Sequence, residues 1–351
     1  MGRKLFIHIG PPKTGTSSLQ WFLRAQRDRL LEEGIFYPED DAHNWQSQRR
    51  LGFALRRKAD PKNGDIPDLK VTLDDLHHQI ENTDAHTIVL SSEEFFAMRP
   101  EAVHRLLDAF ASFDIQIVFY PRRQDDAYIS SFTQRVKVAR RQFTEPIHSF
   151  LDEPHRMSRG LDFYRRGRVW AKNLGKDRIA ARLFDGMEDI RSDFMAMLGN
   201  GALIQLAQDT APEKSNKSPT LEAIEHIRVY KSLVKDPSLY GPASKALIEH
   251  FSSGQRPGNF LATDDRRRIL EFFRLSNESF FEEFLGMENR FDPDLLLGNA
   301  NEERATIDTS NTVELVNNLI AERRRQKQIA RAHAKPRKRI LSALPGRMKR
   351  W

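Results

Sequence analysis

One short stretch, His8–Gln20 (HIGPPKTGTSSLQ), concentrates groups that bind anions. Gly15 lets the backbone approach a ligand closely, and Lys13 adds a positive charge. That glycine is flanked in the sequence by residues with hydroxyl donors, namely Thr14, Thr16, Ser17 and Ser18. The common nucleotide-binding loop, G-x-x-x-x-G-K-[ST], places its lysine after the second glycine, whereas Lys13 precedes Gly15. The stretch therefore predicts a loop for another phosphate-like anion, with a plain surface turn and helix cap as the alternative.

Two arginines and two serines form a second candidate anion site. Arg122 and Arg123 follow the apolar run at 115–120, and Ser130 and Ser131 lie eight positions after them. A planar guanidinium suits a phosphate, and parallel sheets bind ligands beyond the carboxyl ends of their strands. The candidate pair is either Arg122 with Ser130 or Arg123 with Ser131. Two arginines in a solvated loop are the alternative.

Two carboxylates follow the apolar run at 87–91, where the sequence continues SSEEFF. A carboxylate beyond the end of a strand can take a proton from an attacking group. Glu93 is preferred over Glu94 for this role, and carboxylates in the first turn of a helix are the alternative. His8 lies within a strand-like run and is expected to pack or to hydrogen-bond.

The residue types exclude several kinds of chemistry. The chain has no cysteine, which excludes disulfides, thiolate metal sites and a cysteine nucleophile. The runs at 87–91 and 115–120 continue into LSSE and FYPR, so neither leads to the aspartate of a magnesium-binding strand end. No pair of histidines has metal-ligand spacing, and we expect no metal site.

Alternating strand and helix patterns must position these groups. Short apolar runs at 4–9, 87–91, 115–120 and 178–184 predict strands. Helix-like segments at 16–31, 73–82, 99–112, 126–143 and 160–174 lie between them. This alternation predicts an α/β fold, a P-loop-type parallel sheet flanked by helices. After Asp185 nearly all segments read as helices, so we expect one α/β domain over residues 1–300 with a helical part from about 186.

The positive charge of the chain belongs to its C-terminal end. The 351 residues carry a net charge of +7, yet residues 323–351 hold twelve Lys or Arg and no acidic residue. The remainder has 44 basic and 49 acidic residues, a net charge of −5, so the overall charge does not indicate nucleic-acid binding. Residues 301–351 read as a charged linker, a helix from about 311 to 334 and a basic tail.

The basic tail has two interpretations. It is either a disordered charged end or a peripheral anchor on anionic lipid, in which Ile340, Leu341, Leu344 and Trp351 supply apolar contacts. No apolar run is long enough to span a membrane, and the N-terminus lacks the pattern of a signal peptide. We therefore expect a cytoplasmic protein, peripheral at most to the inner membrane face.

The first stretch resembles a known family. PPKTGTSSLQ is similar to the 5′-phosphosulfate-binding loop of sulfotransferases that use 3′-phosphoadenosine 5′-phosphosulfate (PAPS), above all the bacterial and carbohydrate-type members. In that family the lysine precedes the glycine. The resemblance implies that Lys13 contacts the oxygen bridging sulfate and phosphate. It also implies that Thr14, Gly15, Thr16 and Ser17 surround the phosphosulfate.

The second stretch resembles the same family. IVFYPRRQDDAYISSFTQ is similar to its 3′-phosphate signature, an arginine followed eight positions later by a serine. The continuation Phe-Thr-Gln at 132–134 favours Arg122 with Ser130, although the family commonly has Arg-x-Pro where this chain has Pro-Arg-Arg-Gln. Ser-Ser-Glu also resembles bacterial members, which implies that Glu93 is the base.

The sequence therefore predicts a sulfotransferase with Lys13 and Glu93 as catalytic residues. PAPS is the expected donor and 3′-phosphoadenosine 5′-phosphate (PAP) the product, with no metal. The expected acceptor is a hydroxyl or amine on a glycan or glycolipid. Two alternatives remain open. One is a nucleotide-dependent kinase, which predicts dependence on magnesium, and the other is a non-catalytic nucleotide-binding or membrane-associated protein.

Overall fold

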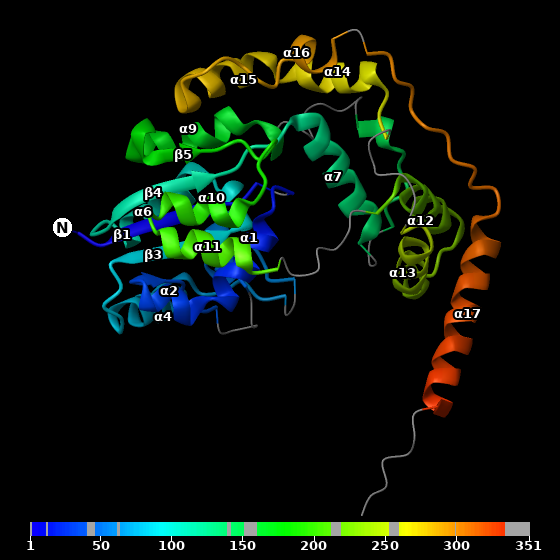
Figure 1. Cartoon of the computed structure of the whole chain (residues 1–351), viewed down its shortest axis with the longest axis horizontal. Helices are drawn as coiled ribbons and strands as arrows, with labels where there is room; N and C mark the ends of the chain where they lie inside the picture. The colour runs from blue at the N-terminus through cyan, green and yellow to red at the C-terminus, as the bar shows by residue number, and fades with distance from the viewer. Residues whose placement is uncertain are drawn as a thin grey trace, which may run out of the picture.

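The structure is a computed structural model. It describes residues 2–11, 13–40, 46–61, 64–138, 142–150, 160–211, 219–252, 260–298 and 300–333. Figure 1 shows an elongated molecule with a sheet toward one end and a group of helices toward the other.

A five-stranded parallel sheet forms the centre of the sheet-containing part. Its order is β2-β3-β1-β4-β5. The strands are β1 (Lys4–Ile9), β2 (Ile35–Phe36), β3 (Thr87–Ser92), β4 (Asp114–Phe119) and β5 (Ile179–Ala181). The predicted α/β fold with a parallel sheet flanked by helices is confirmed. The edge strand β2 has only two paired residues, which leave no periodic pattern in the sequence.

Strand order brings three loops to one edge of the sheet. β1 lies in the middle, where His8 is in register with Ser91 of β3 and with Val118 of β4. The chain places β3 on one side of β1 and β4 on the other, and all three strands are parallel. The segments after β1, β3 and β4 therefore leave the same edge at the point where strand order reverses, which is where open α/β sheets bind ligands.

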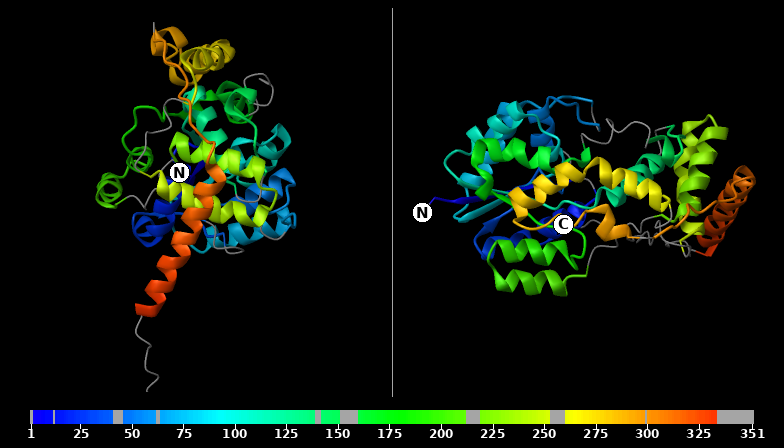
Figure 2. Two further views of the ribbon diagram at one scale, coloured as in Figure 1. Left: turned by 90° about the vertical axis from the view of Figure 1, so that its right-hand side faces the viewer. Right: turned by 90° about the horizontal axis from the view of Figure 1, so that it is seen from above.

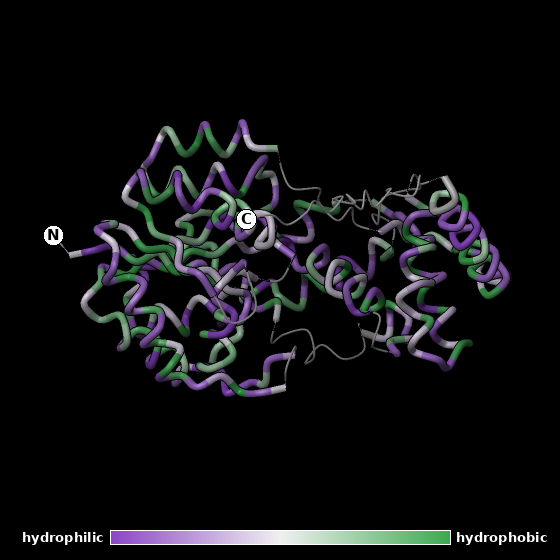
Figure 3. Tube along the Cα trace, turned by 90° about the horizontal axis from the view of Figure 1, so that it is seen from below, coloured by the Kyte–Doolittle hydropathy of each residue, from purple (hydrophilic) through white to green (hydrophobic). Residues whose placement is uncertain are grey.

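Helices cover both faces of this sheet. One face packs against α3 (Arg49–Arg56), α4 (Leu69–Glu81), α5 (Glu93–Phe96), α6 (Pro100–Ala109), α9 (Phe163–Leu174) and α15 (Arg274–Phe280). The other packs against α1 (Thr16–Ala25), α2 (Arg27–Glu32), α10 (Ile190–Met197) and α11 (Gly201–Asp209). Successive side chains of a strand face the two layers in turn. In β1, Leu5 and Ile7 face the first layer and Phe6 faces the second. Figure 3 shows hydrophobic residues concentrated along these strands.

A third apolar cluster joins α7 to the C-terminal helices. α7 (Gln124–Lys137) leads from β4 to a group formed by α12 (Leu221–Leu233), α13 (Tyr240–His250), α14 (Thr263–Phe272) and the first half of α17 (Thr312–His333) (Figure 1). Val316 of α17 is fully buried there, whereas the second half of that helix extends away from the other elements (Figure 2). The predicted helix from about 311 to 334 is confirmed. Residues 334–351 lie outside the described residues.

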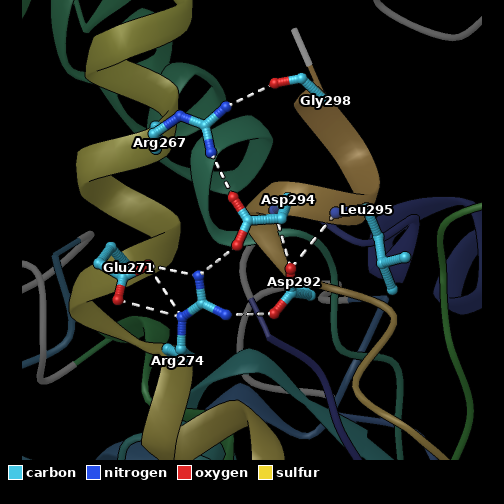
Figure 4. A network of polar contacts seen from close by, with 7 residues as sticks. All are labelled: Arg267, Glu271, Arg274, Asp292, Asp294, Leu295 and Gly298. Atoms are coloured by element: carbon cyan, nitrogen blue, oxygen red, sulfur yellow. Dashed lines mark hydrogen bonds and ion pairs between the residues drawn. The ribbon is translucent and has the colours of Figure 1, made fainter.

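A network of charges folds the segment after α15 back onto α14 (Figure 4). Arg274 pairs with Glu271 and with Asp292 and Asp294 of the following segment, and Arg267 donates to Asp294 and to the carbonyl of Gly298. This segment contains the short helix α16 (Pro293–Leu297). Asp292 accepts hydrogen bonds from the amides of residues 294 and 295, and proline occupies the first helical position, a start signal that the sequence shows.

Two further helices were not expected. α3 and α11 are short and carry no long apolar period, and they are stabilised by packing against the sheet layers. The remaining described helical turns are a π-turn at Phe281–Leu285 and 3-10 turns at Ile147–Phe150, Lys176–Arg178 and Pro237–Leu239. None of the described helices is both long and apolar enough to cross a membrane.

Candidate active site

The loop between β1 and α1 leaves the start of that helix without a side-chain cap. Gly15 is the N-cap residue, and no side chain of the described chain accepts a hydrogen bond from the first turn, which also lacks an acidic residue. Helix starts of this kind offer free backbone N–H groups and a partial positive charge. Gly15 has φ 72°, and a side chain there would come within 3.0 Å of Phe184. The site can therefore hold an anion against the backbone.

The hydroxyls of Thr14 and Thr16 brace this loop from inside. Thr14 Oγ1 donates to the carbonyl of Pro11 at 2.9 Å, and Thr16 Oγ1 donates to the same carbonyl at 3.4 Å. A Cβ atom on Gly10 would lie 2.5 Å from Thr16 Oγ1, so the strand end needs glycine for this packing. Ser17 is exposed. The threonines thus shape the loop, and an anion would meet the backbone amides and the hydroxyl of Ser17.

Residues that follow β4 form hydrogen bonds with both the side-chain ammonium and the backbone carbonyl of Lys13. Its ammonium donates to Gln134 Oε1 at 3.1 Å, and its carbonyl accepts from Arg122 at 3.2 Å. Its φ of 72° is a left-handed conformation, which costs a non-glycine residue about 1–2 kcal/mol. Burial lowers the pKa of Lys13; the charge of Glu93 raises it and that of Arg122 lowers it further. The lysine is therefore a partly desolvated cation whose charge interacts with both groups.

Arg122 lies beside the loop with part of its guanidinium unsatisfied. Its Nε atom is buried and has no hydrogen-bond acceptor among the described residues. The guanidinium also lies 5.6 Å from the centre of the Phe184 ring, and Nε is 3.9 Å from Asp185 Oδ1. This separation is longer than a hydrogen bond, so the buried Nε donor is available to an anion.

Arg123, in contrast, is engaged in a structural ion pair. Its Nε donates to Oδ1 of the fully buried Asp125 at 2.9 Å, and Arg266 of α14 pairs with the same carboxylate. These two guanidinium groups hold the pKa of Asp125 below its usual range despite burial. Asp125 and Arg266 thereby join the start of α7 to α14, and Arg123 is part of the same ion-pair group.

Ser130 lies on the side of α7 that faces the loop. Gln134, four residues later, contacts Lys13, and Lys137 follows at seven residues, so the three share one stripe of the helix. Ser131 lies about 100° around the helix axis from Ser130. The hydroxyl of Ser130 has no hydrogen-bond partner within the described chain, and its carbonyl accepts from Thr133.

Glu93 begins α5 directly after β3. Within the described chain, no hydrogen bond or ion pair engages its carboxylate. Burial raises the pKa of Glu93, and Arg49 and Lys13 oppose this shift. A partly desolvated carboxylate near a lysine is a common arrangement for a general base, because its raised pKa strengthens it as a proton acceptor.

Glu94 points elsewhere and is occupied. Its carboxylate pairs with Arg56 and lies 3.3 Å from the ammonium of Lys58. A Cβ atom on Gly52 would come within 2.4 Å of the Glu94 Cβ atom, so α3 and α5 pack in direct contact. Glu94 therefore ties α5 to α3.

His8 is a packing residue, as expected. It is fully buried, its Nδ1 is 2.8 Å from Ser91 Oγ, and its ring packs edge-on against Tyr120 and Phe194. Burial lowers the pKa of His8 to about 3, so the ring is neutral at physiological pH.

The structure adds Arg49 and Lys137 to this region and gives a contact to Gln134, which the sequence showed only as part of Phe-Thr-Gln at 132–134. Arg49 of α3 acts electrostatically on Glu93, Gln134 contacts Lys13, and the positive charge of Lys13 reaches Lys137. The two α7 residues follow Ser130 at helical spacing, so that spacing could have identified them. Arg49 lies in a helix without a sequence signal. Within the residues that the structure describes, no cluster of three His, Asp or Glu could hold a metal ion.

No model of a known protein family and no curated protein matches the sequence. Among solved structures, the chain is similar to the crystal structure of a sulfotransferase from Alicyclobacillus acidocaldarius, with 16% sequence identity and a TM-score of 0.41. The likeness covers 68% of this chain and 99% of that one. At this level it bears neither on activity nor on individual residues.

Proposed function

We propose that the protein transfers a sulfuryl group from PAPS to a hydroxyl or amine acceptor on a glycan or glycolipid. The observation that carries the proposal is the position of Arg122. Its buried, unsatisfied Nε lies beside an uncapped helix start and a lysine, so two anion-binding groups meet at one strand edge. A donor with a 5′-phosphosulfate and a separate 3′-phosphate requires two such groups.

The described residues fit this donor. The free backbone amides at the start of α1 suit the 5′-phosphosulfate. Arg122 and the unoccupied hydroxyl of Ser130 suit the 3′-phosphate, since a guanidinium binds two phosphate oxygens at once. Arg123 is already paired with Asp125, which supports Arg122 and Ser130 as the pair that binds the 3′-phosphate.

The site residues divide the chemistry of transfer between them. In the reaction, the bond between sulfur and the bridging oxygen breaks, its electron pair stays on that oxygen, and a new bond joins sulfur to the acceptor atom. Lys13 stabilises the charge that builds on the leaving oxygen. Glu93 accepts the proton that the acceptor loses. The pairing of Glu94 with Arg56 and Lys58 supports Glu93 as the base.

Calorimetry with PAP and ADP tests the donor assignment. Wild-type protein should bind PAP at least about tenfold more tightly than ADP, because hydrogen bonds from charged groups to the 3′-phosphate contribute about 1.5–3 kcal/mol. Arg122→Ala should remove most of this preference and leave ADP binding unchanged. Arg123→Ala is the matched control, which should retain the preference and melt at a lower temperature because Asp125 loses a partner. Equal affinity of the wild type for PAP and ADP would refute the assignment, and magnesium-dependent binding of ATP would support a kinase.

The proposal includes a peripheral contact between residues 323–351 and anionic lipid, because Arg324, Arg325 and Lys327 are exposed on the projecting half of α17. The full chain should sediment with phosphatidylserine vesicles at low salt and less at high salt. Binding to neutral vesicles alone, or to none, would contradict this contact.

A further inference from the structure

Lys137 is a half-buried cation that the roles assigned above do not use. It occupies the last turn of α7, and no hydrogen bond or ion pair engages its ammonium within the described chain. Burial lowers the pKa of Lys137, and the positive charge of Lys13 lowers it further. Two like charges near one another repel, and an anion that binds both offsets this repulsion.

The orientation of α7 places Lys137 on the side of the loop. The hydrogen bond from Lys13 to Gln134 fixes which face of the helix meets the loop. Lys137 is three residues beyond Gln134 and therefore follows it on the same face, one turn later. The ammonium groups of Lys13 and Lys137 thus approach one region from the loop and from the helix.

A buried lysine fixes the last turn of α7. The Nζ atom of Lys231, which is fully buried, donates to the carbonyls of Val136 and Val138, the latter at 2.9 Å. These carbonyls flank Lys137, and such C-terminal carbonyls have no partner within a helix. The Lys231 ammonium also lies 5.4 Å from the centre of the Tyr240 ring. The backbone of Lys137 is therefore held in place without its own side chain taking part.

We propose that Lys137 is a substrate-contacting residue whose ammonium binds the sulfuryl oxygens of the donor. The inference rests on the proposed function. Lys13 would meet the bridging oxygen of the same group, so the two lysines would hold the sulfuryl group from two directions. Gln134, one turn before Lys137 on α7, accepts a hydrogen bond from the Lys13 ammonium and keeps it against this side of the helix.

The test compares PAPS with PAP, which lacks only the sulfuryl group. Calorimetry is run on the full chain without acceptor, with Lys137→Met, Lys137→Arg and the wild type. Lys137→Met should lose about tenfold in PAPS affinity and less than about twofold in PAP affinity, because one charge-assisted hydrogen bond is lost only with PAPS. Lys137→Arg should restore part of the loss, since it keeps the charge. Lys172→Met, an exposed lysine of α9, is the matched control and should change neither affinity.

The outcomes separate this inference from the donor assignment. Equal losses of PAP and PAPS affinity would overturn it, because Lys137 would then contact the nucleotide. Unchanged PAPS affinity in Lys137→Met would overturn it as well. If the wild type bound neither PAP nor PAPS, the proposed function itself would fail. Melting curves of each variant show whether a loss of affinity reflects a loss of folded protein.

Discussion

Replacing Lys13 by glycine is expected to lower the rate of sulfuryl transfer by a factor on the order of 10²–10³ without destabilising the fold. The rate falls because no cation remains at the leaving oxygen, and loss of one such electrostatic contact typically costs that much. The fold is spared because the residue has φ 72°, a conformation that glycine adopts without strain. This relief offsets the greater freedom of glycine in the unfolded chain.

The substitution separates chemistry from folding better than alanine would, because alanine would keep the strained conformation. The measurement is steady-state transfer together with thermal melting of the same preparation. Lys13→Arg is the matched control: it keeps a positive charge and should retain more activity than the glycine variant. Near-normal turnover in Lys13→Gly would remove Lys13 from the mechanism.

Replacing Glu93 by glutamine is expected to lower transfer by about 10²–10⁴ and to leave PAP affinity within about twofold. Glutamine keeps the shape of the side chain but cannot accept a proton. Because burial raises the pKa of Glu93, the folded state binds its proton more readily than the unfolded state does. Stability from this group therefore falls as pH rises from the ordinary glutamate value through the raised one. At neutral pH the glutamine variant should be at least as stable as the wild type.

The same pKa shifts predict the pH dependence of the wild type. Glu93 must be deprotonated, so its raised pKa moves the acid limb of the rate profile above that of an ordinary glutamate. Lys13 must be protonated, so its lowered pKa moves the alkaline limb below that of an ordinary lysine. The pH range over which the enzyme is active should be narrower than an unperturbed glutamate and an unperturbed lysine would give. The Glu93→Gln variant should lose the acid limb of the profile.

Glu94→Gln is the matched control for this prediction. It removes the partner of Arg56 and Lys58 and should cost about 1–2 kcal/mol of stability, because these charges are only partly solvated. Its transfer rate per folded molecule should change little. If Glu94→Gln abolished transfer while Glu93→Gln did not, the two carboxylates would exchange roles.

The sheet and its loops follow from local sequence signals. The runs at 4–9, 87–92 and 114–119 are buried over most of their length on both faces and are therefore mostly apolar, which makes their strands visible in the sequence. The loop after β1 can be recognised in the sequence from its glycines and its hydroxyl-bearing residues. The two-residue strand β2 and the helix α3 leave no such pattern, since pairing with β3 and contacts with α4 and α5 determine them.

The site is less visible in the sequence than the sheet. Glu93 and Glu94 are adjacent and identical in type, and only the packing of α3 against α5 places one of them beside Arg56. Arg122 and Arg123 differ because Asp125 engages the second arginine and is itself held by Arg266, 141 positions away. Such distinctions depend on contacts between distant segments. No pattern within one segment could have predicted them.

The most direct measurement of the central claim is a comparison of two labelled donors. The wild-type chain is incubated with glycan and glycolipid fractions and either [³⁵S]PAPS or [γ-³²P]ATP with magnesium, and label in the acceptors is counted, with Lys13→Gly as the blank. We expect ³⁵S in an acceptor fraction, formation of PAP in equal amount, and no ³²P. Transfer of ³²P instead, or PAP binding with no ³⁵S in any fraction, would contradict the central claim.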